Sequence, residues 1–459
     1  MNYTYYLKIK NILKNSKIDI NQEIEKEKQK LSLVKKESLW GLTKSQKEYL
    51  SELIKISDAN ESFFRYLKLK KIMKMLTKKC DKKIRIVFFC YEYQTFPSFQ
   101  STYDKMKKDN RFVCDLVHIP FYHIDKKYNE ELELKDYIKN GYSEIIKSTE
   151  YDLVTKSPDI AFFLKPYDLI PKEYYIDEIK QVINKSIYIP YGMEVGAAKE
   201  SARYQFQLPL HDEAWMCISY CKEHYKRACK YSKQKGKNFQ LIGHPRMDLI
   251  HYNFTDDKDY KRIKKKAKNR KIFMWNPHFT IEDGDNWGTF KMYGLDVLKY
   301  FANHKELFLL YRPHPLLKEA LQKECDSNTL LKYQQLLMDN KDNIFTDESG
   351  NYLVSMHIAD VLISDANSFV PEFLIYNKPV IYTKKPNTSG FKNTELESMV
   401  YTCNCKQDIF SNISNLNKNI DKLKLKREKD IKDIFKFDEN IYVADKIISY
   451  ITDYFNMEA

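Results

Sequence analysis

The sequence predicts an α/β protein with two doubly wound domains that face each other across a cleft, preceded by a helical segment. Two observations carry this prediction. Short, unbroken apolar runs, typical of buried parallel strands, recur between residues 84 and 382 and alternate with stretches of helical periodicity. The chain has 459 residues, 43% of them hydrophobic, which is too long for one ordinary core. Strands that alternate with helices form βαβ units, and therefore parallel sheets.

The N-terminal segment, residues 1–80, is basic and reads as helical. It holds 19 Lys and Arg against 9 Asp and Glu, and so supplies most of the net charge of +14. Apolar residues such as Phe63, Phe64 and Leu67 recur at spacings of three and four. We expect either a helical collar on the main body or helices at an anionic membrane surface. Without a base-reading motif or interleaved stacking aromatics, no nucleic-acid partner is expected.

The remaining chain is expected to form two sheets and a terminal helix. Residues 81–200 form the first predicted domain, with strands at 84–90, 112–119, 159–164 and 186–190. Residues 201–440 form the second, with strands at 214–219, 239–242, 271–275, 307–311, 361–364 and 379–382. Residues 441–459 should form a helix that could brace the first domain. Open sheets of this kind hold their ligands at the carboxyl ends of the strands.

Cysteine content, hydropathy and missing motifs limit the cellular compartment and the classes of enzyme that are expected. The nine cysteines are scattered without CxxC spacing, which favours reduced thiols in a cytoplasm. There is neither a signal-peptide pattern nor an apolar run of about 20 residues, so a soluble or peripheral protein is expected. Asp283-Gly284-Asp285 follows no strand and is interpreted as a loop. Motifs of P-loop enzymes, dehydrogenases, zincins and α/β hydrolases are missing. We expect no metal site and no tightly bound cofactor; use of Mg²⁺ stays an open alternative that no motif supports.

The loop after residues 361–364 is a candidate phosphate site. It runs Asp365-Ala-Asn367-Ser368 and leads into an apolar helix that contains Glu372. Ser368 is placed to cap that helix, and the unpaired N–H groups of a helix start attract an anion. Pro371 fits in the first helical turn. In the alternative interpretation, Asp365 and Ser368 only cap the helix.

Three more loops place cations or imidazoles at strand ends. Arg312-Pro-His314-Pro holds its two polar residues on a stiff backbone, where Arg312 could fork onto phosphate and His314 could stabilise a leaving phosphate. Asn276-Pro-His278-Phe-Thr280 repeats this design, with His278 and Thr280 expected near the reacting group. Gly243-His244-Pro-Arg246 either touches a ligand or forms a turn that joins the domains.

Taken in order, these segments resemble the CDP-glycerol glycerophosphotransferase family of teichoic-acid and capsule enzymes, which has the two-domain GT-B fold of Rossmann-type domains. The resemblance covers roughly residues 82–450. The segments that carry it are Ile189-Pro-Tyr-Gly-Met193, Gly243-His-Pro-Arg-Met-Asp248, Asn276-Pro-His-Phe-Thr280, Arg312-Pro-His-Pro315 and Ser364-Asp-Ala-Asn-Ser-Phe369.

The resemblance implies a CDP-activated donor such as CDP-glycerol, whose pyrophosphate is attacked by an acceptor hydroxyl with loss of CMP. The acceptor would be a surface polysaccharide or a lipid-linked polymer, and the enzyme would work at the inner face of the membrane. Arg312, His314, Asp365 and Ser368 fall on positions expected to hold or polarise the donor. The predicted donor-binding set is completed by Asn367, Glu372, Thr280, His244 and Arg246.

The sequence departs from the family at a candidate general base. Members often carry His-Gly-Thr near the end of the first domain, where this chain has Tyr191-Gly192-Met193, the predicted acceptor side. Either Glu194 or His278 then takes the proton, or the transferred group differs from glycerol phosphate. A GT-B glycosyltransferase that uses a sugar nucleotide in capsule or lipopolysaccharide synthesis is the first alternative. A non-catalytic capsule assembly protein is the second.

Overall fold

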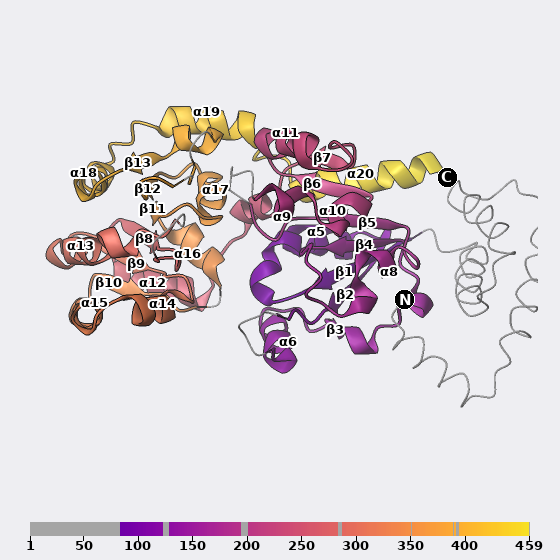
Figure 1. Cartoon of the computed structure of the whole chain (residues 1–459), viewed down its shortest axis with the longest axis horizontal. Helices are drawn as coiled ribbons and strands as arrows, with labels where there is room; N and C mark the ends of the chain where they lie inside the picture. The colour runs from indigo at the N-terminus through magenta and orange to yellow at the C-terminus, as the bar shows by residue number, and fades with distance from the viewer. Residues whose placement is uncertain are drawn as a thin grey trace, which may run out of the picture. The chain divides into compact units, whose positions relative to one another are not determined.

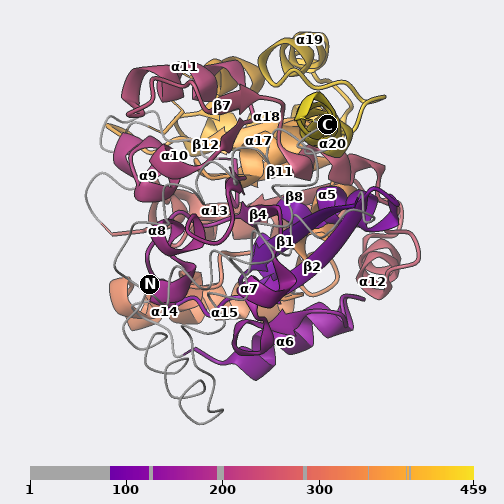
Figure 2. The same cartoon turned by 90° about the vertical axis from the view of Figure 1, so that its right-hand side faces the viewer.

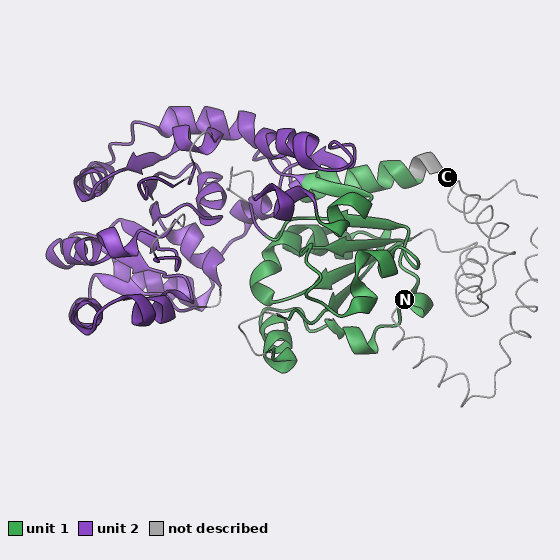
Figure 3. Ribbon diagram, in the orientation of Figure 1, with its two compact units in different colours: residues 1–191, 208–218, 444–459 green, residues 192–207, 219–443 purple. Residues whose placement is uncertain are grey.

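The computed structural model describes residues 83–122, 128–193, 201–282, 287–349, 351–388, 390–391 and 394–458 (Figure 1). The basic segment 1–80 and Glu194 therefore lie outside the described residues. The described chain forms two compact units, shown in Figure 3. The first unit holds the described part of residues 1–191 together with 208–218 and 444–459, and the second holds the described part of 192–207 and 219–443. Among the described helices, none has the length and apolar character to cross a bilayer.

The first sheet has seven strands in the order β3-β2-β1-β4-β5-β6-β7. β1 and β2 lie side by side in Figure 2, in parallel register from Ile84 opposite Phe112. Phe88 of β1 stacks on Phe162 of β4 at 4.5 Å, deep in the apolar core. The strands are β1 (Ile84–Cys90), β2 (Phe112–His118), β3 (Ile146–Lys147), β4 (Ile160–Phe163), β5 (Lys185–Tyr188), β6 (Met216–Ser219) and β7 (Phe239–Leu241).

Helices follow most strands of this sheet, as a βαβ arrangement requires. They are α5 (Pro97–Lys108), α6 (Glu130–Lys139), α7 (Leu153–Lys156), α8 (Ile176–Ile179), α9 (Ala202–Phe206), α10 (Pro209–Glu213) and α11 (Lys222–Tyr231), with short 3₁₀ turns η1 (Tyr93–Thr95), η2 (Ser148–Glu150) and η3 (Lys172–Tyr174). The C-terminal helix α20 (Val443–Glu458) belongs mainly to the first unit. There Tyr450 and Tyr454 pack on Trp215, and Asp445 pairs with Lys105 at 2.9 Å.

The second sheet has six strands in the order β10-β9-β8-β11-β12-β13, all paired in parallel. The strands are β8 (Ile272–Asn276), β9 (Phe308–Tyr311), β10 (Ile344–Thr346), β11 (Val361–Ser364), β12 (Val380–Thr383) and β13 (Tyr401–Cys403). Figure 1 shows α13, α15 and α18 on one face of this sheet and α16 and α17 on the other. Both faces are covered, and this explains why its strands are continuously apolar.

The described part of the second unit also contains helices and 3₁₀ turns between residues 245 and 434. They are α12 (Lys258–Ala267), α13 (Phe290–Asn303), α14 (Leu317–Glu324), α15 (Ser327–Asp339), α16 (Tyr352–Ile358), α17 (Phe369–Leu374), α18 (Lys406–Asn417), α19 (Lys424–Ile434), η4 (Pro245–His251) and η5 (Glu395–Met399). The central apolar cluster includes Phe273, Trp275 and Val297.

The predicted fold class is confirmed: two parallel, doubly wound sheets with interleaved helices. All ten predicted strands are present, within one or two residues of their expected ends. Two of them were predicted in the wrong sheet: the strands expected at 214–219 and 239–242 of the second domain are β6 and β7 of the first sheet, where β6 pairs with β5. Three further strands, β3, β10 and β13, have two or three residues each and were not predicted. In both sheets the strand order reverses beside the first strand, between β1 and β4 and between β8 and β11. Doubly wound sheets place their ligands at such a reversal.

Candidate active site

Three of the predicted loops meet at the carboxyl edge of the second sheet. β8 lies between β9 and β11, with Trp275 opposite Tyr311 and Asn276 opposite Ser364, so the three strands end at nearly the same level. The loops at 276–280, 312–316 and 365–368 therefore leave the sheet side by side. The loops after β8 and β11 flank the point where the strand order reverses. This edge of the sheet is the candidate active site.

Asp365 ties these loops together. Its side chain is fully buried, and one carboxylate oxygen accepts the backbone N–H of His278 at 2.7 Å. The other oxygen accepts the N–H of Thr289 at 3.2 Å and the hydroxyls of Thr289 and Thr383, the latter at 2.7 Å. Burial raises the pKa of Asp365 to about 6, and these hydrogen bonds oppose the rise. The predicted donor-binding role is corrected, because a buried anion with four internal donors positions loops and does not attract a phosphate.

The residue that caps α17 is Asn367, not Ser368. The side-chain oxygen of Asn367 accepts the N–H of Phe369 at 2.9 Å, whereas Ser368 makes no capping hydrogen bond. Ser368 already has helical backbone angles (φ −65°, ψ −18°), so it lacks the extended conformation of a capping residue. Asn367 also donates to Asn276 at 3.1 Å and to Ser364 at 2.9 Å. The amide of Asn367 is thus committed to the loop, which corrects its predicted contact with the donor.

His278 and His314 form a pair of imidazoles, with ring centroids 5.5 Å apart. The Nδ1 atom of His278 accepts the backbone N–H of Thr280 at 3.3 Å and lies 2.7 Å from the Thr280 hydroxyl. The Nδ1 atom of His314 accepts the backbone N–H of Leu316 at 3.2 Å. A backbone N–H only donates, so each neutral ring carries its proton on Nε2. The two neutral rings therefore carry their Nε2–H groups on loops that follow neighbouring strands.

This geometry bears on the role of His278 as a base. Burial lowers the pKa of His278 to about 4, with Glu282 opposing the shift, so the ring is neutral near pH 7. Its proton-accepting atom, Nδ1, is already occupied by Thr280. His278 is therefore better suited to donate to an oxyanion than to take a proton. Thr280, predicted to bind the donor, instead orients this ring.

Arg312 is held by an internal carboxylate. Its Nη1 atom pairs with Asp347, and its Nη2 atom donates to the backbone oxygen of Ser349 at 2.7 Å. Asp347 is fully buried; although burial raises its pKa, the charge of Arg312 and hydrogen bonds from Ser355 and Ser349 hold that pKa below its ordinary value. Both terminal nitrogens of Arg312 thus have acceptors inside the protein, and its predicted fork onto phosphate stays a prediction. Asp347 was missed because it follows β10, a strand of three residues.

Arg246 and Glu372 neutralise each other inside the protein. Their side chains are 7% and 6% exposed and lie 2.7 Å apart, and Tyr352 donates to the second carboxylate oxygen of Glu372 at 2.9 Å. His244, fully buried, accepts the backbone N–H of Arg246 through Nδ1 at 3.2 Å. The predicted donor contacts of His244, Arg246 and Glu372 are therefore corrected. The charge of Arg246 is already neutralised by a buried carboxylate, so it is not available to bind a phosphate. The contacts of these residues instead connect η4 to α16 and α17.

The predicted acceptor-side segment begins at the end of the first unit. The carbonyl of Tyr191 accepts a hydrogen bond from Ser98 at 2.9 Å, and Met193 is fully buried. Gly192 lies against the loop after β11: a Cβ atom placed on it would be 3.6 Å from Cβ of Ser368. The segment therefore reaches the candidate site, and its role toward an acceptor stays a prediction.

Comparison with known families decides what this site belongs to. The family model of CDP-glycerol:poly(glycerophosphate) glycerophosphotransferase matches residues 200–446, more than half of the chain. The chain belongs to this family. It is therefore a transferase, and the matched region contains His278, His314 and Asp365. No curated protein is similar enough in sequence to match.

Solved structures show which fold this glycerophosphotransferase shares. A variant of the wall teichoic acid polymerase TagF soaked with CDPG is 16% identical, with a TM-score of 0.52 over 90% of this chain and 98% of that chain. MnaA from S. aureus, in a co-structure with UDP, is 14% identical, with a TM-score of 0.51 over 81% and 97%. A UDP-GlcNAc 2-epimerase from Neisseria meningitidis bound to UDP-GlcNAc is 11% identical, with a TM-score of 0.54 over 81% and 100%. At this identity they show the GT-B-like fold alone.

Proposed function

We propose that this glycerophosphotransferase moves a glycerol-phosphate-like unit from a CDP-activated donor to a hydroxyl of a teichoic-acid-like or surface-polysaccharide acceptor, with release of CMP. Membership of the family supports the type of transfer. The observation that carries the proposal within the chain is the pair of imidazole N–H groups at the carboxyl edge of the second sheet. Donors at this edge suit a diphosphate.

In the proposed reaction, the acceptor oxygen forms a bond to the phosphorus of the transferred unit while the bond from that phosphorus to the CMP oxygen breaks. Negative charge grows on the departing oxygen, and the Nε2–H groups of His278 and His314 donate to it. Positioning and charge stabilisation dominate phosphoryl transfer, so no covalent intermediate is needed. The proton of the acceptor hydroxyl passes to a base. Glu194 is the remaining candidate for that base, because the Nδ1 atom of His278 is occupied.

Product analysis tests the donor. Incubation with labelled CDP-glycerol and a glycerol-phosphate oligomer is expected to release CMP and extend the oligomer by glycerol-phosphate units. A sugar-nucleotide glycosyltransferase would instead release a nucleoside diphosphate when supplied with a sugar donor. If neither type of donor is consumed, the assembly-protein alternative replaces the proposal.

We also propose that the basic segment 1–80 attaches the enzyme to the inner, anionic face of the cell membrane. Its surplus of Lys and Arg over Asp and Glu supports this, since each basic residue near an anionic surface contributes about 1 kcal/mol. The full chain should sediment with phosphatidylglycerol vesicles at low salt, and the chain without residues 1–80 should remain in the supernatant. Equal sedimentation of the two proteins would remove the proposal.

A further inference from the structure

The second unit has an open, basic hollow of about 650 Å³, to which the proposed reaction assigns no role. Four cations line it, Lys268, Arg270, Lys271 and Lys305, together with Glu306 as the single carboxylate among the described lining residues. Lys271 directly precedes β8, and Lys305 lies just before β9. The hollow is therefore at the amino edge of the sheet, whereas the imidazole pair is at the carboxyl edge. At about 3.3 Å per residue, these strands separate the two sites by roughly 15 Å.

Arg270 and Lys271 of the hollow donate to neutral oxygen atoms, and among the described residues none of the four cations forms an ion pair, so the carboxylates of Glu306 and Asp342 offset only part of the positive charge. Arg270 donates to the backbone oxygens of Lys266 and Asp342, each at 2.7 Å. Lys271 donates to the backbone oxygen of Leu416 and to the side chain of Asn419, each at 2.6 Å. These bonds hold the side chains in place without cancelling charge. The hollow thus keeps a positive potential, in contrast to the neutralised Arg246 and Arg312.

Helix α12 ends beside this hollow, because Lys268, the residue after the helix, is part of its lining. Its last turn contains Lys264, Lys265 and Lys266, all exposed, and Lys268 follows directly. Among the described residues, none of these four lysines forms an ion pair. A single phosphate could contact only a few of these cations at once. A ligand with several phosphates along its length would use both the hollow and α12.

The other lining residues indicate what lies between those phosphates. Asn269, Asn417 and Asn419 contribute amide groups, which donate and accept hydrogen bonds from hydroxyls. Among the described lining residues there is no aromatic ring on which a nucleobase would stack. Nor do these described residues include an apolar side chain of the kind that a membrane-surface element inserts among lipids. Cations with amides fit a chain in which phosphodiesters alternate with hydroxyl-bearing units.

We propose that the basic hollow is an exosite for a polyol-phosphate chain, namely the polymer that the enzyme extends. This inference rests on the proposed function for the identity of the polymer. Binding of the chain at the amino edge, away from the reacting phosphorus, keeps a long product on the enzyme between additions. The exosite therefore governs product length and affinity for long chains, and has no part in the transfer step itself.

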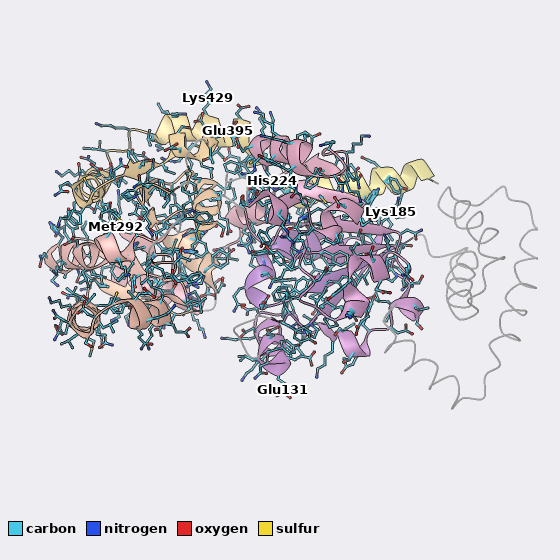
Figure 4. The ribbon with its side chains drawn as sticks, viewed as in Figure 1. Glu131, Lys185, His224, Met292, Glu395 and Lys429 are labelled. Carbon is cyan, nitrogen blue, oxygen red and sulfur yellow. The ribbon has the colours of Figure 1, made fainter. Side chains whose placement is uncertain are left out.

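The test compares two double variants of the full chain. Lys268→Gln with Lys305→Gln removes two charges from the hollow, and Lys332→Gln with Lys429→Gln removes two exposed charges elsewhere. Lys332 is on α15, and Lys429 extends from the outer side of α19 in Figure 4. Titration with a long, fluorescently labelled poly(glycerol phosphate) should show affinity about tenfold weaker for the first pair only, since charged hydrogen bonds are the strong ones. Equal affinity of the two pairs would overturn the proposal.

Three further measurements separate the explanations. With a single-unit acceptor, both variants should release CMP at the wild-type rate, while with long acceptors the hollow variant should make shorter products. Polymer titration needs no turnover, so it tests the exosite even if CMP release fails and the proposed function falls. Loss of binding to phosphatidylglycerol vesicles or to a single-stranded oligonucleotide, with polymer binding intact, would assign the hollow to that partner instead.

The stability of the variants is controlled separately. Should the Lys268→Gln, Lys305→Gln variant melt at a lower temperature than the control variant, the titration is repeated with Lys268→Gln alone, because Lys268 is exposed.

Discussion

Replacement of His314 by asparagine is expected to lower kcat for transfer from CDP-glycerol by about 10²-fold or more, within the range for loss of a positioned proton donor. The side-chain oxygen of asparagine can take the place of Nδ1 and accept the N–H of Leu316, 3.2 Å away in the native protein. The loop should therefore keep its shape. What the variant lacks is the Nε2–H group that would donate to the departing CMP oxygen. Steady-state kinetics with varied donor should show the loss mainly in kcat.

Two further variants test whether the loss in His314→Asn comes from the missing Nε2–H group. His314→Gln places an amide N–H near the position of Nε2 and should recover part of the activity that His314→Asn loses. His304→Ala removes a histidine whose Nδ1 atom bonds only locally, to the backbone oxygen of Tyr300 at 2.7 Å, and should behave as wild type. Full activity of His314→Asn, or equal losses for His304→Ala, would remove His314 from the transfer step.

The sequence was informative about strands and about which loops meet. Apolar runs of four to seven residues, such as Ile84–Cys90 and Val361–Ser364, identified every longer strand because both faces of a parallel sheet are buried. Strand ends then placed the loops with His278, His314 and Asp365 at one edge. Short strands such as Ile344–Thr346 have too few residues to show a recognisable apolar pattern. Side chains that follow such strands, such as Asp347, were therefore not predicted to lie near the site.

The sequence was less informative about which polar groups remain available to a ligand. Arg312 and Arg246 follow strands, as phosphate-binding cations often do, yet each meets a carboxylate that is 35 or 126 residues away along the chain. Residue spacing shows the edge at which a side chain emerges, but not the partner that tertiary packing brings to it. The prediction that Ser368 caps α17 was wrong for a local reason, because Ser368 already has helical backbone angles.

Replacement of Asp365 by alanine is expected to lower the free energy of unfolding by about 3–5 kcal/mol near pH 7 and to abolish most transfer activity. The change leaves two buried backbone N–H groups and two buried hydroxyls without their acceptor, and each unsatisfied group costs about 1–3 kcal/mol where it cannot find another partner. These donors belong to the loop after β8, the start of α13 and the end of β12. The loop that holds His278 would lose its anchor, so activity falls with stability.

Asp360 supplies a matched control at the opposite end of the same strand. It directly precedes β11, is exposed, and accepts a single backbone N–H, that of Ile272 at 2.8 Å. Asp360→Ala should therefore cost only about 1 kcal/mol and leave transfer activity intact. Denaturant unfolding of the two variants, followed by assays of the folded proteins, makes the comparison. Similar losses in both would show that Asp365 has no special role in joining the loops.

The pH dependence of stability gives a second signature of Asp365. Burial raises its pKa from 3.8 to about 6, so the folded protein resists ionisation of this carboxyl more than the unfolded chain does. The stability that Asp365 contributes is full below about pH 4 and is lost as the pH rises through 6, by up to about 3 kcal/mol. Asp365→Asn keeps the size of the side chain but does not titrate, so the difference in unfolding free energy between wild type and this variant should change across pH 4–6. A difference that stays constant over that interval would mean that the carboxyl titrates as it does in the unfolded chain, and that its burial has no electrostatic cost.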